Sequence, residues 1–164
     1  MAQNQPSSAI AVIPSDTINI PVPGIITSGT NTGGATTLTD AGQDFTNATT
    51  NANGYNISGG DVVISAAGVI SEIASVDSAT QLTLLTAIAA GTYDIYKGNY
   101  QILGKSEGFT LFVGTGGPAT VLRIQTLTGQ DVSLLNIPDS SFIPIQVQRV
   151  WATTTTCSNI IALQ

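Results

Sequence analysis

The sequence predicts an all-β protein, in which a β-sandwich or jelly-roll-like domain is interrupted by a small inserted antiparallel β-barrel or meander. Helix signals are scarce, because 17 glycines, 7 prolines and 23 threonines leave hardly any helix-length stretch without a breaker or a β-branched cluster. Short apolar segments recur instead at intervals of about ten residues, separated by turn residues. This spacing is typical of sandwiches and jelly-roll barrels.

The first segment combines the signals of an extended arm and of an edge strand. Pro14, Pro21 and Pro23 punctuate it, and proline lacks the N–H donor that a central strand needs. We therefore expect residues 1–28 to form an N-terminal arm and the first strand of the sandwich, with that strand near 17–20. The arm up to Pro14 is weakly charged, so we expect it to become ordered only on another chain or on the inserted module.

Residues 29–97 are expected to form the inserted module, because the composition changes there. The module opens with a loop rich in glycine, threonine and asparagine, which contains a weak strand signal at 35–39. Stronger strand candidates follow at residues 60–65, 69–76, 81–86 and 92–96. The turns between them are short and contain Gly or Asp-Ser, which favours antiparallel hairpins.

Residues 98–164 are expected to complete the sandwich. Strand candidates lie at residues 109–113, 119–126, 132–137, 142–151 and 159–163. The last long segment alternates apolar residues with Gln146 and Gln148, which is the period-two pattern of a half-buried strand. We therefore expect one of its faces to carry Ile143, Ile145, Val147, Arg149 and Trp151.

The charge balance argues against nucleic-acid and membrane partners. Four basic residues against ten acidic ones give a net charge of −6, which cannot neutralise a run of phosphates and is repelled by an anionic membrane. No apolar run has the length of a membrane-spanning helix, and the N-terminal residues lack the features of a secretory signal. We therefore expect synthesis in the cytoplasm, with no nucleic-acid or membrane partner.

The residues also argue against an enzyme. The chain has no histidine, and its single cysteine, Cys157, can build neither an internal disulfide nor a zinc site by itself. The segment 114–119 fits the letters of a dinucleotide fingerprint, but a β-branched run follows it in place of a helix. Asp40 and Asp44 supply too few oxygens for calcium without backbone carbonyls. We expect no catalytic, cofactor-binding or metal-binding residues.

Motifs in both parts of the chain resemble β-modules of virion structural proteins from tailed bacteriophages. In the C-terminal third these motifs are LFVGTGG at 111–117, IPDSSFIP at 137–144 and RVWATTTT at 149–156. In the middle of the chain they are LTDAGQDFT at 38–46, GDVV at 60–63 and VDSATQLTL at 76–84. One departure is Thr154, which stands where the closing motif usually has a glycine.

The resemblance implies a capsid accessory, head-fibre or spike-base protein without catalytic residues. Among these we expect a decoration or cement protein on the capsid surface of the virion, made in the host cytoplasm, which binds the major capsid protein and stabilises the shell. We also expect a homo-oligomer, with a homotrimer favoured, because symmetric association hides strand edges. The candidate interface residues are Ile10, Val12, Ile13, Ile18, Ile20, Phe142, Arg149 and Trp151.

A host-recognition module on a tail fibre or spike is the alternative. It would bind a surface glycan through Trp151, Tyr93, Tyr96 or amide side chains. The interpretation of Trp151 that we favour is a core residue or subunit contact, with Arg149 stacked on its ring. A cement protein would be present in hundreds of copies per virion, and a tail protein in only a few.

Overall fold

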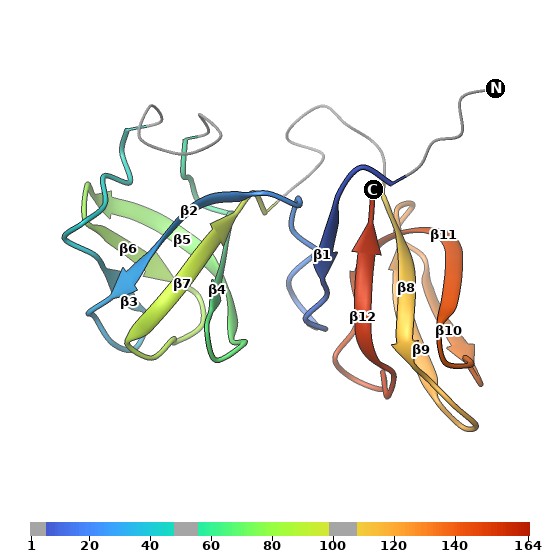
Figure 1. The fold of residues 1–164 in the computed structure, drawn as a ribbon. Helices are drawn as coiled ribbons and strands as arrows, with labels where there is room; N and C mark the ends of the chain where they lie inside the picture. Colours follow the sequence, from blue (N-terminus) through green and yellow to red (C-terminus); the bar gives the residue numbers. More distant parts are fainter. Residues whose placement is uncertain (1–5, 48–55, 99–107) are drawn as a thin grey trace. The chain divides into compact units, whose positions relative to one another are not determined.

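The computed structural model describes residues 6–47, 56–98 and 108–164, and the regular structure in these ranges is β-strand (Figure 1). The strands form two antiparallel sheets of six strands each, which confirms the all-β fold class. No helix in the described ranges has the length and apolar character needed to span a membrane. The chain divides into a terminal unit, residues 1–20 and 101–164, and an inserted unit, residues 21–100.

The inserted unit begins at Pro21 rather than at the expected residue 29. The reason is β2 (Ile25–Asn31), which spans the expected boundary and pairs along its length with β7 (Gly91–Tyr96). The strand expected near residues 17–20 is also absent. The Ser15 hydroxyl accepts hydrogen bonds from two backbone N–H groups in this stretch, those of Thr17 and Ile18, and turns the chain there instead.

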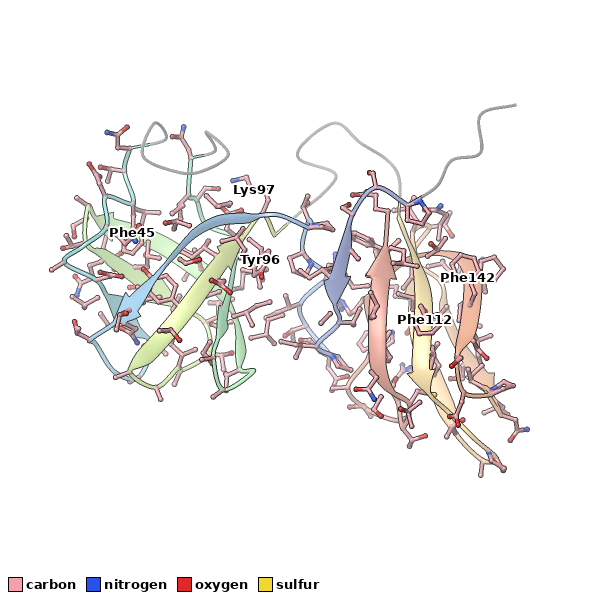
Figure 2. The ribbon with its side chains drawn as sticks, in the orientation of Figure 1. Phe45, Tyr96, Lys97, Phe112 and Phe142 are labelled. Carbon is pink, nitrogen blue, oxygen red and sulfur yellow. The ribbon has the colours of Figure 1, made fainter. Side chains whose placement is uncertain are left out.

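The sheet of the inserted unit has the order β2-β7-β4-β5-β6-β3. Its remaining strands are β3 (Thr37–Thr39), β4 (Val62–Ser65), β5 (Ile70–Ser78) and β6 (Gln81–Leu84). Together with β7 they confirm the strands expected at residues 35–39, 60–65, 69–76, 81–86 and 92–96. Alternate residues of these strands meet in one core, which contains Phe45 (Figure 2).

Asn31 joins the two outer strands of this sheet to each other. Its Oδ1 accepts hydrogen bonds from the backbone N–H groups of Gly33, at 2.8 Å, and Thr39, at 3.0 Å. Beside it, the Thr32 N–H donates to the Thr39 carbonyl at 2.8 Å. Because β2 and β3 lie at opposite ends of the strand order, these bonds curl the sheet into a closed barrel.

Asp40 makes a second connection across the same closure. The side chain is buried, and its Oδ2 accepts hydrogen bonds from the Thr30 N–H, at 2.8 Å, and the Tyr93 hydroxyl, at 2.9 Å. Its Oδ1 accepts from the Gly42 N–H at 2.9 Å. Gly29 leaves the space that this arrangement needs, since a Cβ there would overlap Asp40 Oδ2 and approach the Tyr93 ring closely. The carboxylate therefore has a structural role in the barrel.

The sheet of the terminal unit has the order β1-β12-β8-β11-β9-β10. Its strands are β1 (Ala9–Ala11), β8 (Phe109–Thr115), β9 (Val121–Thr126), β10 (Asp131–Leu135), β11 (Ser141–Val150) and β12 (Ser158–Leu163). Strands β8 to β12 confirm those expected from the sequence. β11 pairs first with β8 and then with β9, so it passes from one half of the sheet to the other. This arrangement is consistent with a β-sandwich.

The predicted alternation along β11 is wrong in its second half. The register shifts between Ile143 and Val147 and again between Val147 and Arg149. As a result Val147 and Val150 are both buried, at 0% and 1% exposure, while Arg149 and Trp151 remain half-buried. A bulge adds one residue to a strand and reverses the side-chain alternation beyond it. The bulge therefore keeps the Arg149 guanidinium out of the apolar core, where burial of its charge would cost free energy.

The expectation that the N-terminal arm orders only on another chain or on the inserted module is wrong for its described part. β1 pairs with β12 of its own unit, Ala9 opposite Leu163 and Ala11 opposite Ile161. The Val12 N–H continues this pairing by donating to the Ile160 carbonyl at 2.8 Å. The edge of β12 thus supplies the partner that the arm needs. Residues 1–5 lie outside the described residues.

Candidate functional site

An apolar row crosses the outer face of four strands in the terminal unit. In β8 the buried residues are Phe109, Leu111 and Val113, so Phe112 points to the opposite face. Phe112 lies opposite Phe142 of β11 on one side and opposite Ile161 of β12 on the other. Ala11 of β1 continues the row, since it pairs with Ile161. Figure 2 shows the Phe112 and Phe142 side chains on these neighbouring strands.

The side chains of this row are accessible. Phe142 is 52% exposed and Ile161 is 37% exposed, and Phe112 between them is half-buried. We call this surface the apolar outer face; its members are Ala9, Ala11, Thr110, Phe112, Phe142, Pro144, Ile161 and Leu163. None of these side chains carries a charge. Contiguous exposed apolar surface with aromatic side chains is typical of protein interaction sites.

The charge of the chain is divided unequally between the two units. The inserted unit has one cation, Lys97, and the acidic residues Asp40, Asp44, Asp61, Glu72, Asp77 and Asp94, which give −5. The terminal unit has the cations Lys105, Arg123 and Arg149 and the acidic residues Asp16, Glu107, Asp131 and Asp139, which give −1. The apolar outer face therefore belongs to a nearly neutral unit.

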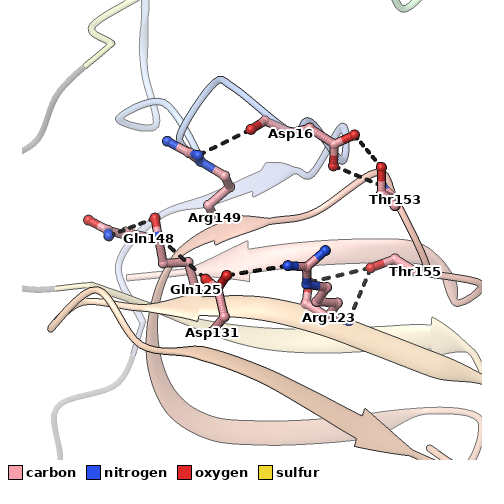
Figure 3. A network of polar contacts seen from close by, with 8 residues as sticks. All are labelled: Asp16, Arg123, Gln125, Asp131, Gln148, Arg149, Thr153 and Thr155. Atoms are coloured by element: carbon pink, nitrogen blue, oxygen red, sulfur yellow. Dashed lines mark hydrogen bonds and ion pairs between the residues drawn. The ribbon is translucent and has the colours of Figure 1, made fainter.

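Arg149, Asp16 and Thr153 belong to a polar network on the other half of the terminal sheet, which we call the polar clamp (Figure 3). The Arg149 Nε donates to Asn19 Oδ1 at 2.8 Å, and its Nη1 donates to the Asp16 carbonyl at 3.3 Å. The guanidinium carbons of Arg149 and Arg123 lie 5.1 and 4.6 Å from the centroid of the Trp151 ring. Such cation–π contacts stabilise a fold. The clamp therefore fastens the chain around residues 16–19 to the strand end at Trp151.

The threonine run at 153–156 belongs to this clamp. Thr153 donates to the Asp16 carboxylate through its N–H, at 2.8 Å, and its hydroxyl, at 2.5 Å; the hydroxyl bond is the main cause that lowers the Asp16 pKa. The Thr155 hydroxyl accepts from the Arg123 N–H at 3.1 Å. Thr154 has a φ of 76°, the left-handed region that favours glycine. A glycine at this position would adopt the same backbone conformation without a Cβ penalty.

The interface residues expected from the sequence fall into four places. Ile10, Ile18 and Ile20 are at most 9% exposed, so they belong to the core of the terminal unit and leave the candidate set. Val12 and Ile13 are half-buried beside β1, and Arg149 and Trp151 lie in the clamp. Phe142 lies on the apolar outer face. Phe112 and Ile161 were not among the expected interface residues, because only the strand register shows that they lie beside Phe142.

Residues considered for chemistry or for glycan binding have structural roles in the fold. Tyr93 is 2% exposed, its hydroxyl donates to Asp40, and burial together with this carboxylate raises its pKa. It therefore offers no ring for a sugar. The turn at 114–119 leads directly into β9. Within the described ranges, no three His, Cys, Asp or Glu side chains converge as metal ligands.

We compared the chain with family models, with curated proteins and with solved structures, and none matches it.

Proposed function

We propose that the chain is a non-enzymatic structural protein of a tailed-bacteriophage virion, which decorates the capsid and stabilises the shell. In this proposal the apolar outer face of the terminal unit binds the major capsid protein. Two observations support it: the resemblance of the motifs to phage β-modules, and above all the exposed row that contains Phe112, Phe142 and Ile161. A decoration protein needs a surface that favours contact with the shell over contact with water.

The physical basis of the binding is the removal of apolar surface from water. Burial contributes about 25 cal/mol per Å² of apolar surface, and a few aromatic anchors commonly supply most of the affinity of an interface. The outer face has no charge to desolvate, so little of this gain is lost. A protein that binds only the assembled shell stabilises it by mass action, and many symmetric copies multiply the effect.

The inserted unit has the complementary role in this proposal. Its barrel is closed by Asn31 and Asp40, and it carries −5 of the total charge of −6. A strongly acidic unit stays hydrated and repels identical units on neighbouring copies. It would therefore remain in solvent on the virion surface.

The proposal predicts that Phe142→Ser weakens binding to shells assembled from the major capsid protein by about tenfold or more, because it removes an aromatic anchor. The fold should survive, since this side chain is 52% exposed. Co-sedimentation with shells measures the affinity. The matched control is Leu85→Ser, which changes an apolar residue, 63% exposed, in the inserted unit.

Leu85→Ser should bind shells as the unmodified chain does. Equal binding by the unmodified chain and both variants would contradict the proposed attachment surface. Absence of binding by the unmodified chain would contradict the proposed function itself.

A further inference from the structure

The terminal sheet has an open edge at β10. Among the strands of the described residues, β10 pairs only with β9, through an unbroken register from Asp131 to Leu135. Natural sheets usually protect such an edge with proline, lysine, a bulge or a very short strand. β10 has five residues and none of these devices, and its only charged residue, Asp131, already pairs with Arg123 at 3.3 Å.

Two hydrogen bonds establish which backbone groups of β10 face the open side. The Thr126 N–H donates to the Gln130 carbonyl, and the Asn136 N–H donates to the Thr120 carbonyl, both at 2.8 Å. In an antiparallel ladder the hydrogen-bonded pairs recur at every second residue. The even-numbered residues of β10 therefore bond to β9, and Asp131, Ser133 and Leu135 direct their N–H and C=O groups away from it.

We propose that a second copy of the chain binds this edge, with the two β10 strands antiparallel about a twofold axis at Ser133. In this register Ser133 lies opposite Ser133 of the second copy, and Asp131 lies opposite its Leu135. The three residues that face the open side then become hydrogen-bonded pairs, so every outward N–H and C=O group gains a partner. The two sheets would join into one continuous sheet across the axis.

The side chains fit the same register. On the core side, Val132 of each copy lies opposite Leu134 of the other, and both side chains are half-buried in the single chain. The two Asp131 residues are four steps apart along the ladder, about 14 Å at roughly 3.4 Å per residue. That distance exceeds the Debye length of about 8 Å at physiological ionic strength.

The self-complementary register is the reason to choose a second copy as the occupant, because it places each Val132 opposite a Leu134 and gives every outward backbone group a partner. The net charge of −6 adds the condition that like charges must not meet at the contact. The β10 register meets this condition, because its acidic residue lies opposite a leucine. This contact is separate from the apolar outer face and would give a twofold dimer, which differs from the homotrimer expected from the sequence.

Cysteine trapping tests the register directly. Directly opposite residues of a hydrogen-bonded pair have Cα atoms about 5.5 Å apart, within the range that a disulfide spans. Ser133→Cys should therefore form a disulfide-linked dimer under mild oxidation, while native Cys157 stays buried. The matched control is Ala9→Cys, which places an exposed thiol on β1 at the other edge of the sheet and should give little dimer. Equal cross-linking of both variants would overturn the proposal.

Mass measurement by sedimentation gives an independent result. The unmodified chain should approach about twice 16.7 kDa at high concentration. Ser133→Lys places two ammonium groups face to face at the axis, and should weaken the dimer at least about tenfold, with partial recovery at high salt. A chain that stays monomeric, a trimer mass, or a dimer that survives Ser133→Lys would each overturn the proposal.

Discussion

The two units each contain a six-stranded sheet, but they differ in whether the outer strands are joined to each other. In the inserted unit, the buried side chains of Asn31 and Asp40 join the outer strands β2 and β3 into a closed barrel. In the terminal unit, no described strand pairs with the outer edge of β10, and the apolar row of Phe112, Phe142 and Ile161 lies on the surface of β8, β11 and β12. A unit whose outer strands are hydrogen-bonded to each other and whose charge is strongly acidic therefore needs no partner chain. Open edges and near neutrality make a unit suited to contacts.

The chain allows the two units to be observed separately. Its single tryptophan, Trp151, lies in the terminal unit, whereas all four tyrosines lie in the inserted unit, at residues 55, 93, 96 and 100. Tryptophan fluorescence therefore reports the unfolding of one unit, and tyrosine absorbance reports the unfolding of the other. The two signals together measure the stability of each unit by itself.

The largest effect is expected from Asp40→Ala. It removes the acceptor of the Thr30 and Gly42 N–H groups and of the Tyr93 hydroxyl, and leaves these buried donors without a partner. We expect the free energy of unfolding of the inserted unit to fall by about 3–5 kcal/mol. Urea titration measures it by tyrosine absorbance, while the tryptophan transition should stay in place. An equal shift of both transitions would contradict the separation of the two units.

A smaller effect is expected from Lys97→Met. The Lys97 Nζ lies 2.9 Å from Asp61 Oδ2, and the two side chains are only 11% and 4% exposed. Removal of the cation leaves the Asp61 carboxylate buried without its ionic partner, which should lower the free energy of unfolding by about 3 kcal/mol. The hydrogen bonds from the N–H groups of Ser58 and Gly98 to this carboxylate remain and reduce the loss.

The matched control for this buried pair is the exposed pair of Arg123 and Asp131 in the terminal unit, with side chains 30% and 42% exposed. Asp131→Asn should cost less than about 1 kcal/mol, because surface ion pairs contribute little. The double variant Asp61→Asn with Lys97→Met should recover part of the loss. A Lys97→Met variant as stable as the unmodified chain would show that the pair does not support the barrel.

The smallest effect concerns alkaline pH. Burial and the hydrogen bond to Asp40 raise the pKa of Tyr93 above its ordinary value of 10.0. Because the folded-state pKa is the higher one, the stability that this phenol contributes is complete below pH 10 and is lost as the pH rises above it. The inserted unit of the unmodified chain should weaken in that range.

Tyr93→Phe should lose about 1 kcal/mol at neutral pH and most of this alkaline sensitivity, since it lacks the ionising hydroxyl. Urea titrations at several pH values measure both effects. An unchanged alkaline sensitivity in Tyr93→Phe would assign the effect to another group.

The sequence predicted β3 to β12 but missed β1 and β2, and it did not predict which strands are neighbours. Short apolar segments between turn residues located β3 to β12, because that pattern is local. The bulge in β11 was not predictable, since it depends on the pairing of one strand with two others. The row of Phe112, Phe142 and Ile161 was not predictable for the same reason, because only the cross-strand register brings these residues together.

The role of Asp40 was also beyond the sequence. From the sequence alone, a carboxylate in a glycine-containing loop is interpreted as a turn residue or a calcium ligand. Its partners Thr30 and Tyr93 come from two different strands, and only the folded barrel brings them together. Likewise the unit boundary at Pro21 depends on the pairing of β2 with β7.

We propose that this chain decorates a capsid through its terminal unit. The most direct test is to search particles purified from cells that express the chain, and to measure its copy number and location in them by quantitative mass spectrometry and cryo-electron microscopy. We expect one copy per major capsid subunit or per three subunits, with density of the terminal unit against the shell. A few copies at the tail, or none in the particle, would contradict it.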